Sequence, residues 1–255
     1  MVRGRPAGRD GWRMTTNRPG FLIVGAQKCG STMLHHVLSS HPQLYLPPSK
    51  ELHYFDRSSG YPDAAWYQAQ FAPAGTQLTG EATPIYCFWP GAIERIAADL
   101  PQVKVISILR DPVERAISQH RMELARGDED LPLLAALQAE KNRLAHGGEH
   151  ALRHHSYVAR GRYRTQVAAL HKAFGMERVL LMSLERLVAG TGPGLNELAR
   201  FLGVDAAPLP TEVPKVFAGE ALGQPVDPVA RRFLENALGD ERKALDEWFA
   251  GGFST

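Results

Sequence analysis

The sequence has few cysteines, little net charge and no long apolar run. Its 255 residues include two cysteines, too few for a disulfide framework, and this number fits a reducing compartment, so we expect a cytoplasmic protein. No apolar run approaches the roughly 20 residues of a membrane-spanning helix, and we therefore expect no membrane span. The formal net charge of +2 does not call for nucleic acid or a membrane surface as a partner.

The N-terminal segment is basic but lacks the apolar stretch of a secretory signal. Arginines stand at positions 3, 5, 9, 13 and 18. This composition predicts a mobile basic tail over residues 1–19, with contact to a polyanion as an alternative. A single domain is expected over residues 20–255, since the chain shows no internal repeat. Nothing in the sequence indicates an oligomeric state.

Strands and helices are predicted to alternate along this domain. Apolar runs without polar alternation predict buried strands at 21–26, 103–109 and 179–183, a pattern typical of parallel sheets covered on both faces. The predicted fold is therefore α/β, a three-layer parallel sheet with ligands at the carboxyl ends of its strands. Helical spacing predicts helices at 31–40, 113–124, 133–145, 163–174, 195–202 and 229–249.

A glycine-containing loop joins the first predicted strand to the first predicted helix. Backbone N–H groups in such a loop, the positive end of the helix, an ammonium and two hydroxyls together suit a phosphate or sulfate group. Gly25 and Gly30 have Walker A spacing, but Ser31 stands where the Walker lysine belongs, and the lysine is displaced to Lys28. The loop predicts a P-loop-like nucleotide-binding site, with a plain turn bearing a surface lysine as the alternative. At the helix start, Cys29 could have a lowered thiol pKa, but its expected role is to pack as a small residue within the loop.

Two further segments carry groups that suit the transfer of a charged group. Arg110 ends the predicted strand at 103–109, where a guanidinium can bind a phosphate, and Ser118 follows about two helical turns later. A salt bridge to a neighbouring carboxylate, Asp111 or Glu114, is the alternative for Arg110. Glu51 could serve as the general base for an acceptor hydroxyl or amine, with a solvated loop glutamate as the alternative.

In this order the three segments resemble the sulfotransferases that use 3′-phosphoadenosine-5′-phosphosulfate (PAPS). The branch concerned includes the heparan sulfate sulfotransferases and many bacterial small-molecule enzymes, and the resemblance covers about residues 20–205. It implies an enzyme that moves the sulfuryl group of PAPS to a hydroxyl or amine and releases 3′-phosphoadenosine-5′-phosphate (PAP), without a metal. Heparan enzymes often have a lysine where this chain has Ala82, which favours a small-molecule acceptor over a polysaccharide.

The resemblance assigns roles to the residues that match the family's motifs. It implies that Lys28 contacts the bridging oxygen and that Glu51 is the catalytic glutamate; His53, beside it, is expected to orient it or share its acid–base work. The expected nucleotide-binding residues are Gln27, Lys28, Cys29, Gly30, Ser31, Thr32, Arg110, Ser118 and Tyr163, with Lys215 of the loop at 204–228 as a further candidate. The expected acceptor-side residues are Tyr54, Phe55, Glu81, Thr83 and Pro84.

Other hypotheses remain open at this point. A P-loop kinase using ATP and Mg²⁺ would need the missing Walker lysine, and a degenerate nucleotide- or polyanion-binding module would bind without transfer. The segment 146–150 matches the H-x-x-E-H pattern of zinc proteases, but its adjacent glycines cost a helix about 1 kcal/mol each, so we expect no metal there. Residues 120–160 are instead predicted to form an acceptor-site or lid insertion. Aromatic residues hint at a ring-bearing acceptor or else belong to the core: Trp66, Tyr67, Phe88 and Trp89.

Overall fold

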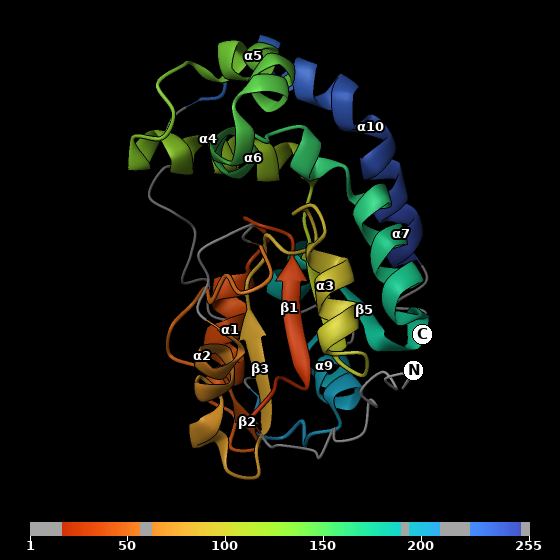
Figure 1. Ribbon diagram of the computed structural model, residues 1–255. Coiled ribbons are helices and arrows are strands. Elements are labelled where there is room, and N and C mark those ends of the chain that lie inside the picture. Colours follow the sequence, from red (N-terminus) through yellow and green to blue (C-terminus); the bar gives the residue numbers. More distant parts are fainter. Residues whose placement is uncertain (1–16, 57–62, 190–193, 210–224, 251–255) are drawn as a thin grey trace, which may run out of the picture.

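The computed structural model describes residues 17–56, 63–189, 194–209 and 225–250. Its centre is a five-stranded sheet with the order β2-β3-β1-β4-β5, in which every pair of neighbouring strands is parallel (Figure 1). The predicted α/β fold is therefore confirmed. The strands are β1 (Phe21–Gly25), β2 (Leu44–Tyr45), β3 (Leu78–Ala82), β4 (Lys104–Leu109) and β5 (Val179–Ser183).

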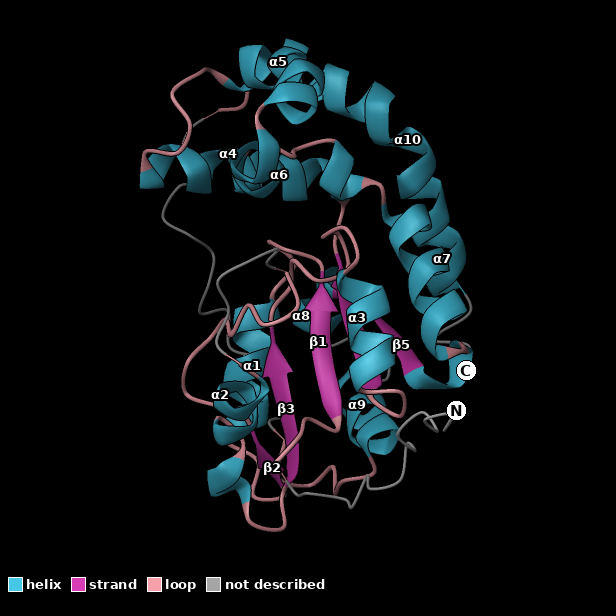
Figure 2. Cartoon of the chain, viewed as in Figure 1, coloured by secondary structure: helices cyan, strands magenta, loops and turns pink. Residues whose placement is uncertain are grey.

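Helices cover both faces of this sheet (Figure 2). They are α1 (Ser31–Ser39), α2 (Ala64–Ala69), α3 (Ala92–Asp99), α4 (Pro112–Arg126), α5 (Leu133–His146), α6 (Gly148–His154), α7 (Tyr163–Phe174), α8 (Leu184–Ala189), α9 (Gly194–Leu202) and α10 (Pro228–Ala250). Short 3₁₀ turns lie at η1 (Ala72–Ala74), η2 (Ala159–Gly161) and η3 (Met176–Arg178). In the described ranges, no helix combines the length and apolar character needed to cross a membrane.

The central strand β1 divides the core into two layers. Phe21 and Ile23 belong to an apolar cluster shared with α1 and α9. Leu22 and Val24 belong to a second cluster, shared with α3 and the end of α7. Successive side chains of a strand point to opposite faces, so an unbroken apolar run is what a strand buried on both faces requires. The three-layer arrangement predicted from that run is confirmed.

A third apolar cluster joins α4, α5 and α10, through residues such as Ile117, Leu137 and Leu234. These helices and α6 lie beyond the carboxyl end of β1 (Figure 1). The carboxyl ends of parallel strands are where ligands bind in such sheets. The helices therefore stand over the edge of the sheet that carries the glycine-containing loop.

Some expectations need correction. The chain is already held in place before residue 20, because Arg18 donates a hydrogen bond to the carbonyl of Asp99 at 2.9 Å; residues 1–16 of the predicted tail lie outside the described residues. Lys215 lies outside them as well. The strands β2 and β3 and the helices α2, α3, α6 and α8 were not predicted, whereas the predicted strands and helices correspond to observed elements.

Candidate active site

The loop between β1 and α1 has a backbone suited to an anion. Lys28 and Gly30 both have left-handed conformations, with φ of 69° and 94°. Gly30 is the N-cap of α1 and, having no side chain, cannot itself accept from the first N–H groups of the helix. A Cβ atom at Gly30 would lie 2.7 Å from Leu184 Cδ1, so glycine is required here for space as well as conformation. The exposed helix end is the anion-binding geometry expected from the sequence.

Three cations converge on this loop. The pKa of Lys28 is lowered by burial and then by the positive charges of Arg126 and Arg110. Like charges held this close favour the binding of an anion, which relieves their repulsion. Arg110 follows β4, the neighbour of β1, as the parallel sheet requires.

The carboxylates that the sequence offered as alternative partners of Arg110 are engaged elsewhere. Asp111 caps α4 by accepting from the N–H groups of residues 113 and 114, and it pairs with Arg242 at 2.6 Å. Glu114 pairs with Arg231 at 2.7 Å. Within the part of the chain that the structure describes, Arg110 forms no ion pair, so its guanidinium is available to a ligand.

Part of the expected nucleotide-binding set supports the loop from behind. Cys29 is fully buried, and burial raises its pKa to about 11, so the hypothesis of a lowered pKa was wrong. Its Sγ lies 3.6 Å from the hydroxyl of Tyr163, which is itself fully buried. Tyr163 therefore packs beneath the loop, and its side chain does not face a ligand there. Ser31 is buried, Thr32 is exposed and Ser118 is half-buried.

A row of alternating basic and acidic side chains forms the opposite side of the site. His53 Nε2 lies 3.4 Å from Glu51 Oε2, and His53 Nδ1 lies 2.8 Å from Asp56 Oδ2. The backbone of His53 is also left-handed, with φ of 55°, which places this ring between the two carboxylates. At the ends of the row, Lys50 Nζ lies 3.2 Å from Glu51 and Arg153 lies 2.8 Å from Asp56.

Asp56 is a buried carboxylate that stays ionised. Burial alone raises its pKa, but hydrogen bonds from His53 and Arg153, together with their charges, bring the pKa below its ordinary value. The side chain is fully buried. It therefore fixes the orientation of the His53 ring and holds Arg153 of α6 against the segment that carries Glu51.

A buried glutamate supports this segment from below. Glu81 accepts hydrogen bonds from the hydroxyls of Tyr67 at 2.8 Å and Tyr86 at 3.1 Å. The hydroxyl of Tyr86 in turn accepts from the backbone N–H of Tyr54 at 2.8 Å. Thr83 Oγ1 donates to Glu81 at 3.3 Å and lies 3.5 Å from the backbone nitrogen of His53.

Most of the expected acceptor-side residues lie inside the protein. Phe55, Glu81, Thr83 and Pro84 are buried, so their side chains support the segment that carries Glu51. Tyr54 is half-buried and stacks on the Tyr67 ring at a centroid distance of 4.1 Å. Burial raises the pKa of Glu81 to about 7, although its three hydroxyl partners act in the opposite direction.

The two sides of the site meet at a cavity of about 230 Å³. Three of the expected site residues line it: Gln27, Glu51 and His53. Sequence reasoning missed the other lining residues, Lys50, Ile85, Glu123, Arg126, Arg153 and His154. All but Ile85 carry polar side chains, and four come from α4 and α6.

The aromatic residues that hinted at a ring-bearing acceptor are mostly structural. The Trp89 ring is buried beneath the Arg153 guanidinium at 4.4 Å, and Phe88 packs against Arg160 at 5.0 Å. Tyr67 is 4% exposed. Of the four, Trp66 alone has an exposed ring, at 38%.

Arg160 is a structural link that the sequence did not indicate. It is almost fully buried and donates to the side-chain oxygen of Gln27 in the loop. It also donates to the carbonyls of Leu152 and Arg153 at 2.8 Å each. Burial and the charge of Arg115 lower its pKa to about 9. One guanidinium thus ties the anion-binding loop to α6.

A parallel sheet with a cationic loop at the carboxyl end of its central strand defines an α/β protein of the P-loop-like class. More narrowly, the chain belongs to the sulfotransferase domain family, whose model matches residues 18–216. Members of this family use PAPS.

Comparison with individual proteins agrees with this assignment. Over 187 residues the chain is 32% identical to human heparan sulfate glucosamine 3-O-sulfotransferase 3B1, covering 73% of this chain and 46% of that protein. The crystal structure of a sulfotransferase from Alicyclobacillus acidocaldarius matches with a TM-score of 0.77 at 29% identity, covering 91% of this chain and 96% of that one. Mouse sulfotransferase SULT7A1, solved in complex with PAP, has a TM-score of 0.54 at 16% identity over 92% of this chain and 89% of that one, which shows the shared fold. The chain spans about half, or less, of the length of the curated relatives it matches.

Proposed function

We propose that this chain transfers the sulfuryl group of PAPS to a hydroxyl or amine of a small, polar acceptor. The observation that carries the proposal is the position of Glu51 and His53 in the same cavity as Gln27 of the anion-binding loop. A base and an anion site that share one cavity are what group transfer between two bound substrates requires. Family membership supports the donor.

The donor side is formed by the loop Gln27–Thr32, with Arg110 and Ser118. The left-handed backbone at Gly30 and the converging cations fit a phosphosulfate. When bound, PAPS supplies the sulfuryl group, and its 5′-phosphate oxygen leaves with the electron pair of the broken S–O bond. Lys28 and the N–H groups of the loop stabilise the charge that develops on this oxygen. Arg110 and Ser118 bind the 3′-phosphate, as in the family that the chain resembles.

The acceptor side is formed by Glu51 and His53. Glu51 accepts the proton of the acceptor hydroxyl as the acceptor oxygen forms its bond to sulfur. Lys50, at 3.2 Å, holds the Glu51 carboxylate in place before the transfer. His53 holds the second Glu51 oxygen, and Asp56 holds His53. Each step uses groups of the protein and the two substrates, and none is routed through a metal.

The cavity wall favours a polar acceptor. Lys50, Arg126 and Arg153 alternate with Glu51 and Glu123 around it, and such a surface hydrogen-bonds hydroxyls better than it solvates apolar rings. One human relative is a glucosamine 3-O-sulfotransferase by name and another is an N-sulfotransferase, which is consistent with a hydroxyl or amine acceptor. Residues 120–160 supply α5 and α6 and the end of α4, and we assign them the role of a wall or lid over the acceptor.

The proposal is tested with labelled PAPS and a panel of sugars, phenols, amines and lipid alcohols. We expect transfer to polar hydroxyl or amine acceptors, and a kcat about 10² lower for Glu51→Gln, because removal of a general base costs about that much. PAP affinity should stay unchanged in this variant. Glu94→Gln, an exposed change on α3, is the matched control.

Three outcomes would contradict the proposal. Near-normal turnover of Glu51→Gln would contradict the assignment of Glu51 as the general base. Thermal stabilisation by Mg-ATP but not by PAP would favour a kinase, and binding of PAP without transfer to any acceptor would favour a degenerate binding module.

A further inference from the structure

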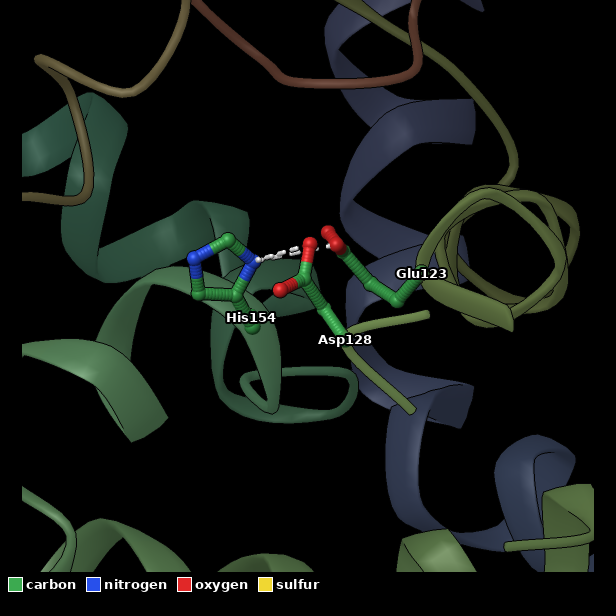
Figure 3. A group of neighbouring side chains, drawn as sticks. All are labelled: Glu123, Asp128 and His154. Carbon is green, nitrogen blue, oxygen red and sulfur yellow. Dashed lines mark hydrogen bonds and ion pairs between the residues drawn. The ribbon is translucent and has the colours of Figure 1, made fainter. Parts of the chain in front are cut away.

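Three side chains, from α4, the turn that follows it and α6, meet beside the cavity. His154 Nδ1 lies 3.1 Å from Glu123 Oε2 and 3.4 Å from Asp128 Oδ2. Figure 3 shows the Glu123 carboxylate and the Asp128 carboxylate pointing toward the His154 ring. One donor atom of each residue lies within 4.8 Å of the other two. The proposed sulfuryl transfer uses none of these three groups.

The end of α4 explains why the two carboxylates lie together. Gly127 ends the helix with φ of 81°, and the backbone N–H of Asp128 then donates to the carbonyl of Glu123 at 3.0 Å. The Nε2 atom of His155 lies 2.9 Å from the backbone carbonyl oxygen of Asp128 and holds this residue in place. Two carboxylates are thus fixed at the negative end of a helix dipole, where each raises the cost of the other's charge. A cation between them offsets this cost.

A second observation points to a ligand at this place. Glu123 is 1% exposed, and no residue in the described ranges donates a hydrogen bond to its Oε1 atom. A buried carboxylate oxygen without a hydrogen-bond partner destabilises the fold. Oε1 belongs to the same carboxylate whose Oε2 lies 3.1 Å from His154, so a cation bound by both oxygens of this carboxylate would satisfy it.

We propose that Glu123, Asp128 and His154 form a binding site for a divalent transition-metal ion. Bonds of about 2.0–2.2 Å from one ion place tetrahedral or octahedral ligands about 3.0–3.6 Å apart. The distances of 3.1 and 3.4 Å from His154 Nδ1 to the two carboxylates fall in this range. Two of the three distances between ligand atoms therefore already suit an ion, and the two carboxylate oxygens lie within 4.8 Å of each other.

The donor set indicates which ions bind. One imidazole nitrogen with two carboxylates suits Zn²⁺ and Mn²⁺, whereas Mg²⁺ and Ca²⁺ prefer oxygen ligands alone. Three protein ligands leave a coordination position for water or a bound molecule. Glu123 and His154 also line the cavity, so this position lies on the acceptor side of the active site. The site uses neither histidine of the H-x-x-E-H pattern, both of which are exposed, although the His150 ring lies 4.7 Å from the His154 ring.

Nearby cationic side chains affect how tightly the site binds a metal ion. Arg126 lines the same cavity, and Lys28 and Arg160 lie close enough for Glu123 to raise their pKa values. The nitrogens Nη1 and Nη2 of Arg160 are engaged by Gln27 and by backbone carbonyls. These charges weaken metal binding, and screening by salt reduces their effect for the exposed members.

The test is calorimetric titration of the full chain, prepared without a histidine tag, with Zn²⁺ alone and with Mn²⁺ alone. We expect one saturable site for each ion, with Zn²⁺ bound more tightly, and weaker binding of Mg²⁺. Asp128→Asn and His154→Ala should each weaken Zn²⁺ binding at least about 10-fold, since each removes a ligand. Asp130→Asn and His146→Ala, at exposed positions nearby, are the matched controls and should leave the affinity unchanged.

Several outcomes would overturn the assignment. They are the absence of saturable Zn²⁺ binding, an unchanged affinity in both ligand variants, and an equal loss in the controls. Asp128 is partly exposed and asparagine has the same shape, so circular dichroism and thermal unfolding should show that this variant is folded. The titration contains no PAPS and measures no transfer, so its failure and the failure of the proposed function are distinguishable.

Discussion

Replacement of Glu81 by glutamine should remove a large pH dependence from the stability of the fold. Glu81 is 1% exposed, and its pKa is raised from the ordinary value of 4.5 to about 7. The folded protein therefore binds this proton more tightly than the unfolded chain does. This contribution to stability is fully present below pH 4.5, where the Glu81 carboxyl is protonated in both the folded and the unfolded protein. It is lost as the pH rises toward 7, because the carboxyl then ionises in the unfolded chain but not in the folded protein.

The magnitude follows from the difference between the two pKa values. At about 1.4 kcal/mol for each pH unit, the interval from 4.5 to about 7 corresponds to a loss of about 3 kcal/mol above pH 7. Because the group is buried, solvent screening does not reduce this figure much. Glutamine keeps an oxygen that accepts from the two tyrosine hydroxyls and has no charge to bury, so its stability should lack this component.

The assay is urea unfolding of wild type and Glu81→Gln from pH 5 to pH 8. The difference in unfolding free energy should shift by about 2–3 kcal/mol in favour of the variant across this range. Titration of the histidines affects both proteins equally, so it cancels in the difference. Glu247→Gln, an exposed change on α10, reports the background. A difference that stays constant with pH would refute the assignment of an abnormal pKa to Glu81.

Three further predictions concern catalysis. Lys28→Ala should lower kcat by about 10² or more, because it removes the charge that stabilises the leaving oxygen; steady-state kinetics with saturating PAPS measure this, and normal kcat would contradict it. Arg110→Ala should weaken PAP binding about 10-fold or more but leave AMP binding nearly unchanged, since AMP lacks the 3′-phosphate. Equal losses of affinity for the two nucleotides in calorimetry would contradict the role of Arg110 in binding the 3′-phosphate. Asp56→Asn should lower kcat about 10- to 100-fold with unchanged PAP affinity, because His53 loses a charge-assisted hydrogen bond; a loss of PAP affinity instead would indicate a general structural defect.

The strands that were predicted from the sequence differ physically from those that were missed. β1, β4 and β5 are apolar on both faces, so their pattern is visible without knowledge of their neighbours. β3 contains Gly80 and Glu81, which are unusual in a central strand. Gly80 is needed because a Cβ atom would collide with the Phe21 ring, and Glu81 is tolerated because tyrosine hydroxyls satisfy it. Both reasons lie in the tertiary structure.

The same distinction separates the two halves of the candidate site. The loop around Lys28 and the segment around Glu51 are contiguous in sequence, so their chemistry could be predicted. Asp56 lies in that second segment and could have been found from its spacing to His53. Arg153, His154 and Glu123 reach the cavity only because α4 and α6 are carried over the sheet by packing against other helices, and no local pattern encodes that packing.

Arg160 shows how these two halves become one site. Its guanidinium bonds both Gln27 of the loop and the carbonyls at the end of α6. One of those carbonyls belongs to Arg153 of α6. The Arg153 side chain pairs with Asp56 and so links α6 to the segment that carries Glu51. The helix that closes the cavity is therefore attached to the donor side through one arginine and to the acceptor side through the other. Because both links are charged or buried hydrogen bonds, a displacement of α6 would break partners on both sides at once, and the loop and the base should move with this helix as a unit.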